Sequence, residues 1–291
     1  MMTDPATRRR SYVRALALAA VVAGCGDSGG PDSGPLPDDA TRAVGLTARD
    51  EVEASLDALT VPTLLGPYGA AAACVNPSDP ADADGDGVPN DAEYIFTAPP
   101  CRFEDIRGTT LDLVGRLQVQ DPAPGPGGAG FAYDATLVNL RSTFTGKDAD
   151  HTYSATRNGT RTLTGTTAGL TLVTDLQVLR TFPGLSDAAV DQQWQVSFEP
   201  DTPLHINQSV PSGTLGITGT MNWSRGTESF VLAVSTPTPI HFDASCDGAQ
   251  RFDAGELHAA GDFSDLTGYV RVRWSDCGDE PSIDFVEDGG A

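Results

Sequence analysis

Basic residues are scarce in this sequence. The 291 residues contain 18 lysines and arginines against 40 aspartates and glutamates, which gives a formal net charge of −22. A polyanion repels nucleic acid and anionic lipid headgroups and favours divalent cations. The composition therefore argues against a nucleic-acid partner and against a membrane surface bound through charge.

Long apolar runs and the short motifs of common cofactor sites are missing as well. The apolar run at residues 15–23 is far below the roughly 20 residues that a membrane-spanning helix needs. There is no Cys-x-x-Cys, no His-x-x-x-His and no glycine-rich turn between a strand and a helix. Zinc, phosphate and dinucleotide sites therefore lack their usual signatures, and we assign no catalytic residue.

The N-terminus carries a secretory signal. An arginine-rich segment, residues 8–14, precedes the apolar run, which ends in Val-Ala-Gly followed by Cys25. This order is typical of a signal peptide with a small-residue cleavage site. Val-Ala-Gly-Cys resembles the lipobox of bacterial lipoproteins, and the resemblance covers residues 1–25. It implies that Cys25 becomes an acylated N-terminus, with chains such as palmitate, and anchors the protein to a membrane of the cell envelope, on its periplasmic or extracellular face.

Composition divides the remaining chain into three parts after the signal peptide, residues 1–24. Residues 25–45 are rich in glycine, proline, serine and aspartate and form a flexible tether. Residues 46–106 hold one helix, predicted over residues 47–59 and ended by Pro62, and a calcium loop. Residues 107–291 form a β domain. Without residues 1–24, 14 basic and 39 acidic residues leave a charge of −25.

The β domain is predicted from period-two patterning. Residues 192–199 alternate Trp194, Val196 and Phe198 with polar residues, as in a half-buried strand. Asn158-Gly159 and residues 224–227 are typical of hairpin turns. With no helices between strands, the fold is mainly β and antiparallel: a sandwich, a barrel or a curved sheet, with one short N-terminal helix.

Part of the C-terminal half also resembles a family pattern. Residues 214–277 contain a Thr/Gly-rich hairpin, Thr-Pro-Thr-Pro-Ile at residues 236–240, Cys246, and a last strand that ends at Cys277. This order resembles uncharacterised β-rich exported lipoproteins of bacteria. The resemblance covers about a fifth of the chain and implies no activity.

Residues 82–93 fit the spacing of a twelve-residue calcium loop. Ca²⁺ takes six to eight oxygens, so alternate side chains must point inward, a glycine allows the sharp turn, and a glutamate at the last position closes the sphere. An acidic surface turn that binds no metal is the alternative. The predicted ligands of one structural calcium ion are Asp82, Asp84, Asp86, the Val88 carbonyl, Asn90 and Glu93.

The loop departs from an EF-hand. Pro89 replaces the aliphatic residue that pairs with a second loop, and Pro77 and Pro80 exclude an incoming helix. The loop resembles the isolated calcium loops of thrombospondin type 3 and dockerin repeats. That resemblance covers these twelve residues alone, and we expect one ion of weak affinity, with a Kd of about 10⁻⁴ to 10⁻³ M.

Four cysteines remain once Cys25 is acylated, an even number that indicates disulfides in an exported protein. Sequence alone leaves three pairings open. Proximity favours Cys74 with Cys101, on either side of the calcium loop, and Cys246 with Cys277. Each bridge would stabilise the fold by roughly 3 to 4 kcal/mol.

Three functions remain open on this evidence. The leading one is a non-enzymatic envelope module that binds a partner, such as another envelope protein or a glycan, or is structural. A carrier of lipid or another apolar ligand would need an apolar pocket of several hundred Å³. A hydrolase would need histidines or carboxylates converging in a cleft. The histidines lie far apart in sequence, at His151, His205, His241 and His258. The tryptophans fall on apolar faces of predicted strands, at Trp194, Trp223 and Trp274.

Overall fold

The computed structural model describes ten segments of the chain, all of which belong to one compact unit. The described segments are residues 39–60, 81–104, 110–125, 131–145, 152–183, 186–205, 208–246, 251–263, 266–277 and 279–288. They contain one helix and eleven strands. The elements are α1 (Asp39–Leu56), β1 (Asp91–Glu104), β2 (Thr110–Gln120), β3 (Tyr133–Thr145), β4 (Tyr153–Thr166), β5 (Gly169–Thr181), β6 (Ala188–Pro200), β7 (Gly213–Arg225), β8 (Glu228–Phe242), β9 (Phe252–Phe263), β10 (Leu266–Trp274) and β11 (Ser282–Glu287).

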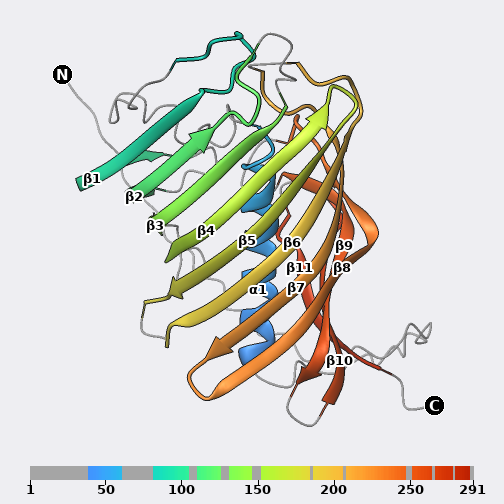
Figure 1. The fold of residues 1–291 in the computed structure, drawn as a ribbon. Coiled ribbons are helices and arrows are strands. Elements are labelled where there is room, and N and C mark those ends of the chain that lie inside the picture. The colour runs from blue at the N-terminus through green and yellow to red at the C-terminus, as the bar shows by residue number, and fades with distance from the viewer. Residues whose placement is uncertain are drawn as a thin grey trace, which may run out of the picture. The chain divides into compact units, whose positions relative to one another are not determined.

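The strands form one antiparallel sheet in which each strand pairs with its neighbours in sequence, in the order β1 to β11. The sheet is strongly curved, and α1, drawn in blue, lies on its concave side (Figure 1). It is open, with β1 and β11 at its edges. The expected mainly β, antiparallel fold with one N-terminal helix is confirmed, and the curved sheet is the arrangement that the chain adopts.

Alternation places the apolar side chains on the concave side. Along β6 every second residue is buried, from Ala188 to Phe198, and the residues between them are exposed. Trp194, Trp223 and Trp274 are all buried in the same core. This confirms that the tryptophans pack in the core, because period two directs alternate side chains to one face.

Helix α1 begins at Asp39, eight residues before the predicted start at Thr47. Ala40, Ala43 and Val44 are buried and continue the apolar face toward the N-terminus. Asp39 lies in the first turn, where a negative charge is favourable. Residues 39–45 of the tether predicted over residues 25–45 are therefore helical, while residues 25–38 and Pro62 lie outside the described residues. None of the described helices is both long enough and apolar enough to span a membrane.

The predicted turn at Asn158-Gly159 is wrong. Both residues lie inside β4, where Asn158 is opposite Gln177 and Gly159 is opposite Leu176. Gly159 has a φ of +131°, and an added Cβ would overlap the carbonyl oxygen of Asp175. The pair thus marks an irregularity opposite β3 and not a chain reversal. The hairpin turn predicted at residues 224–227 is confirmed, since Arg225 pairs with Glu228.

Strand β1 is the element that the sequence prediction missed. It was expected to be part of a helix-and-loop region ending at residue 106, yet Asp91–Glu104 pairs with β2 along its length. The register shifts between Phe96 and Cys101, around two prolines that cannot donate to the ladder. The β domain therefore begins before residue 107, and the loop predicted to bind calcium leads directly into the sheet.

Candidate functional site

The aspartates of the candidate calcium loop converge. Carboxylate oxygens of Asp82, Asp84 and Asp86 all lie within 4.8 Å of one another. The loop is closed at its base, where the Asn90 amide donates to the Ala81 carbonyl at 2.8 Å. Three carboxylates this close repel one another unless a cation or protons lie between them.

Backbone amides hold the first aspartate of the loop in place. Asp82 Oδ1 accepts from the amide of Gly85 at 2.8 Å, and Asp82 Oδ2 accepts from the amide of Gly87 at 2.9 Å. The hydrogen bond from Gly87 is the largest of the effects that lower the pKa of Asp82. Gly85 and Gly87 have φ values of +76° and +88°, which favour glycine and let the chain turn around the carboxylate.

The other predicted ligands lie in different environments. The Asn90 Oδ1 atom accepts from the Ala83 amide at 3.1 Å, so Asn90 faces back across the loop. Val88 is buried, and its amide donates to Asp86 Oδ1 at 2.8 Å. Glu93 lies on β1, and its Oε1 atom is 3.0 Å from Arg116 Nε. The structure therefore brings the three aspartates together and gives Glu93 an ion partner on β2.

One carboxylate oxygen of the loop bears on whether the residues fit a metal ion. Asp84 Oδ2 is buried and has no hydrogen-bond partner within the described ranges. A buried anionic oxygen without a donor is costly, and a hard cation among oxygen ligands removes that cost. The donor set, all oxygen, suits calcium, and the residues therefore fit the ion at this loop.

One of the two predicted disulfides lies within the described residues. Cys246 and Cys277 are bonded, with their Cα atoms 5.4 Å apart, which confirms this pairing. Cys101 lies on β1 and is buried. Its predicted partner Cys74 and the predicted acylation site Cys25 lie outside the described residues, so the other two cysteine assignments stay predictions.

The concave side of the sheet holds a network of buried charges that the sequence analysis did not anticipate. On α1, Glu51 Oε1 lies 2.9 Å from Arg157 Nη2 of β4. The neighbouring Asp50 Oδ2 lies 2.8 Å from Arg180 Nη1 of β5. Burial disfavours the charge on Asp50, but Arg49 and Arg180 outweigh that effect and lower its pKa to about 2. The ion pairs fix α1 on the sheet.

The same network extends along the helix. Arg251, just before β9, pairs with Glu53, and also with Asp57 at 2.7 Å. Arg49 reaches Glu280 at 3.0 Å, close to the start of β11. The sequence does carry a signal for these arginines, because Arg157 and Arg161 are separated from Ala155 and Leu163 by even numbers of residues. Alternation along β4 therefore directs all four side chains to the same buried face.

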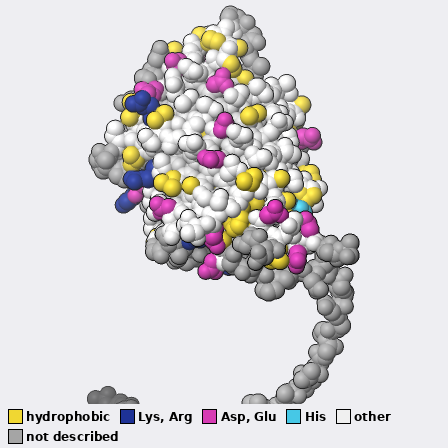
Figure 2. Space-filling view, turned by 60° about the horizontal axis from the view of Figure 1, so that its bottom comes forward, with side chains coloured by type: hydrophobic (Ala, Val, Ile, Leu, Met, Phe, Trp, Pro, Cys, Tyr) yellow, Lys and Arg dark blue, Asp and Glu magenta, His cyan; other side chains and the backbone are white. Residues whose placement is uncertain are grey.

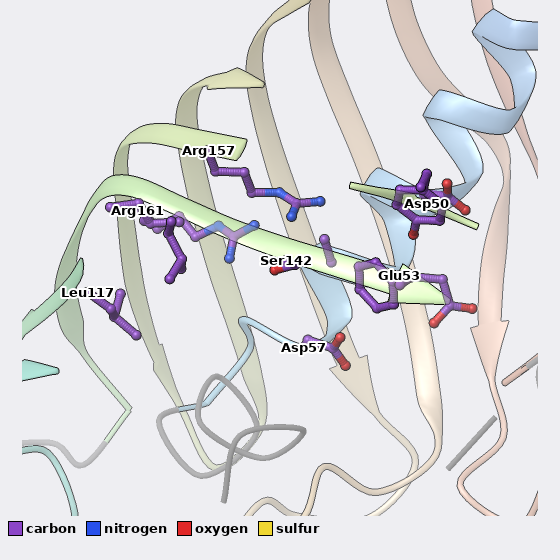
Figure 3. A pocket seen from close by; sticks show the side chains of 12 residues that line it. Asp50, Glu53, Asp57, Leu117, Ser142, Arg157 and Arg161 are labelled. Atoms are coloured by element: carbon purple, nitrogen blue, oxygen red, sulfur yellow. The ribbon is translucent and has the colours of Figure 1, made fainter. Parts of the chain in front are cut away.

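A small cavity lies between α1 and strands β2 to β4. Its volume is about 40 Å³, enough for only a few water molecules. Arg157 and Arg161 extend toward the carboxylates of Glu53 and Asp57 on the helix, and Ser142 lies between them (Figure 3). The cavity is thus lined by the charge network and not by apolar groups alone.

The described histidines do not line this cavity. His241 Nδ1 lies 2.6 Å from Asp253, and its Nε2 lies 3.3 Å from Asp201. Partial burial opposes the charged ring, but the hydrogen bonds to the two carboxylates raise the pKa of His241 above its usual value. A ring that donates through both nitrogens has no lone pair for a general base. His258 stacks on Tyr269, His205 is exposed in a loop, and His151 lies outside the described residues.

The molecular surface carries scattered acidic side chains. Magenta carboxylates are spread over the face in Figure 2, and the visible basic side chains lie along one edge. No family model, curated protein or solved structure matches this chain.

Proposed function

We propose that this chain is an exported lipoprotein, anchored to an envelope membrane through Cys25, whose β domain is a non-enzymatic binding or structural module. The observation that carries the proposal is the filled concave side of the sheet. Helix α1 occupies it and is held there by ion pairs with β4 and β5. A filled core leaves the outer surface of the domain for contacts with a partner.

The two rival functions receive less support from the same geometry. A carrier of apolar ligands needs several hundred Å³ of apolar pocket, whereas the cavity beside α1 has about 40 Å³ and charged walls. A ligand would have to displace α1 and break its ion pairs. A hydrolase needs a free base near a nucleophile, and both nitrogens of His241 face carboxylates.

One calcium ion belongs to the proposal as a structural cofactor. Asp82, Asp84 and Asp86 would hold it through their carboxylates. The Val88 carbonyl and the Asn90 side chain would be further oxygen ligands from the loop. When bound, the ion neutralises the converging carboxylates. The loop leads into β1, so the ion would stabilise this edge of the sheet.

Mass spectrometry of the N-terminus tests the anchor. In the protein purified from membranes, Cys25 should be the first residue and should carry two or three acyl chains. Cys25→Ser should release the protein from the membrane fraction, while Ser28→Ala, in the adjoining tether, should leave it anchored. An unmodified or later N-terminus in the exported protein would refute the proposal.

Thermal unfolding tests the calcium ion. In the mature chain with Cys25→Ser, calcium at about 100 times Kd should add roughly 2.7 kcal/mol of stability and raise Tm. Magnesium should do less, because it demands octahedral geometry and retains its waters. Asp82→Ala should abolish the rise and Asp191→Ala, an exposed acid on β6, should keep it. Identical melting curves of the parent chain in chelator and in calcium would exclude the site.

A further inference from the structure

The disulfide bond joins two connections at one end of the last four strands. Cys246 lies in the connection between β8 and β9, and Cys277 lies in the connection between β10 and β11. Strands β8 to β11 are antiparallel neighbours, so both connections leave the same end of the sheet. The bond therefore fixes one connection to the other.

The connection after β8 contacts helix α1 through Arg251, which directly precedes β9. Arg251 donates from Nη1 to Asp57 Oδ1 at 2.7 Å and from Nε to Glu53 Oε2 at 2.8 Å. Its carbonyl accepts from the Asp243 amide at 3.0 Å, and the Asp243 carbonyl accepts from the Cys246 amide at 3.1 Å. Main-chain hydrogen bonds therefore link the arginine that binds the helix to the half-cystine.

The connection after β10 contacts the same helix through Glu280, shortly after Cys277 in sequence. Glu280 Oε2 lies 3.0 Å from Nη1 of Arg49, a helix residue whose side chain is buried. Beyond this contact β11 begins at Ser282. Each of the two connections that the disulfide joins thus provides an ion partner for α1.

These two partners differ from the arginines that bind α1 from within the sheet. Arg157 and Arg180 lie inside β4 and β5, where a strand is paired on either side and fixes the backbone. Arg251 and Glu280 lie outside the strands. Connections open locally at a lower free energy than the ladders of a sheet, so the positions of Arg251 and Glu280 depend on what constrains the connections.

The disulfide is placed where a reductant can reach it. Cys277 is exposed and Cys246 is half-buried. Exposed disulfides are in general more readily reduced than buried ones. The bond that constrains both connections is therefore also one that a thiol can break.

We propose that the disulfide between Cys246 and Cys277 is a redox switch for the docking of α1 on the sheet. In the oxidised chain it holds Arg251 and Glu280 against the helix. In the reduced chain the two connections move independently, these ion pairs break more often, and α1 opens away from the concave side. The arginines of β4 and β5 then become accessible. The proposal depends neither on the membrane anchor nor on the calcium ion.

The redox step needs a thiol or dithiol as co-reactant. A thiolate of the reductant attacks the Cys277 sulfur, the S–S bond breaks, and Cys246 leaves as a thiolate that takes up a proton. A second thiolate attacks the reductant's sulfur in the mixed disulfide and releases Cys277, which is protonated in turn. Two thiols are thereby oxidised to one disulfide, and the protein gains two electrons and two protons.

Native-state hydrogen exchange of the α1 amides tests the switch in the mature Cys25→Ser chain. Cys246→Ala with Cys277→Ala removes this bond alone and should make local openings of α1 about tenfold more frequent or more, the equivalent of about 1.4 kcal/mol. Dithiothreitol added to the folded parent chain gives the reduced state without refolding and should act alike. Local openings expose little surface, so their exchange should respond weakly to urea.

The amides of β6, in the middle of the sheet, provide the reference for global unfolding. A disulfide that acts only through the unfolded chain changes global unfolding and leaves local openings of α1 as they were. The switch is therefore refuted if the local openings of α1 keep their frequency without the bond. It is equally refuted if α1 exchanges only through the urea-sensitive openings that it shares with β6.

A cycle of variants tests whether the bond acts through the two ion partners. Arg251→Gln with Glu280→Gln should open α1 in the oxidised chain, and loss of the bond should then add less than about twofold, because the two changes act on one contact. Arg273→Gln is the matched control, since it breaks an exposed pair with Glu256 near the same connection. In this control the bond should keep its full effect. Additive effects of the bond and of Arg251 and Glu280 would overturn the proposal.

Discussion

Glu51 is a fully buried carboxylate in the middle of the protein. It lies on α1 and is paired with Arg157 at 2.9 Å and with Arg180 at 3.5 Å. Burial alone would favour its neutral form, but the two guanidinium groups outweigh burial and lower its pKa. Such a pair adds little compared with an apolar core, yet the loss of one partner leaves a buried charge uncompensated.

We therefore predict that Glu51→Gln destabilises the protein by about 3–5 kcal/mol at pH 7. The matched control is Asp112→Asn, which breaks the bidentate pair with the exposed Arg102 on the outside of the sheet. That change should cost below about 1 kcal/mol. Urea unfolding measures both, and equal losses for the two variants would contradict the prediction.

At His241 the pH dependence has a definite sign. Its pKa is raised in the folded state, so the charged ring stabilises the folded protein. This stabilisation is complete below the unfolded pKa of about 6.5 and is lost as the pH rises through the folded pKa. The stability difference between the parent chain and His241→Gln should therefore shrink with rising pH. NMR titration of the ring should give a pKa above about 6.5 that falls in Asp253→Asn; a normal or unchanged value would rule this out.

At the scale of elements, the contact of α1 with the last strands depends on a glycine. A Cβ at Gly45 would overlap the Ile283 side chain on β11 and lie 3.2 Å from Val270 Cγ1 on β10. Helix and strands approach each other this closely because position 45 has no side chain.

Gly45→Ala should destabilise the protein by about 1–3 kcal/mol, because overpacking outweighs the better helix propensity of alanine. Ile283→Ala in the same chain should recover part of the loss, since it removes the overlapping methyl group. A double-mutant cycle measured by urea unfolding checks this. Simple additivity of the two changes would show that the contact does not limit the approach of α1.

The elements predicted well are those whose residues repeat with period two. Strands β5 to β7 follow from alternation alone, because one face packs in the core and the other meets water. Asn158-Gly159 misled the prediction because this pair suits a type I′ turn and also an irregular position within a long strand. Strand β1 was missed because its prolines and the preceding loop obscure its pattern.

The candidate site was predictable only where its ligands are contiguous in sequence. Spacing identified Asp82, Asp84 and Asp86, which the structure brings together. Glu93 matched the spacing, but it lies in the strand that begins at Asp91, where its carboxylate pairs with Arg116 of β2.

At the scale of the whole molecule, one disulfide joins the segment after β8 to the segment after β10. Cys246 and Cys277 are 31 residues apart in sequence, and closing a loop of that length stabilises a fold by about 3–4 kcal/mol through the unfolded chain. The variant with both Cys246→Ala and Cys277→Ala should lose about that much. Urea unfolding without reductant measures the loss, and an unchanged midpoint would contradict it.

The helix that fills the concave side is also the first described element of the chain, and this sets an order of folding. Neighbouring strands can pair locally as the chain emerges, since the sheet has no crossover. The partners of α1 lie much later: Arg157 follows Glu51 by 106 residues, and Glu280 follows Arg49 by 231. Contacts over such separations form after local ones, because the loop must close first. The first of the described elements to be synthesised is therefore the last of them to dock, and nearly all of the described chain must be present before the core is complete.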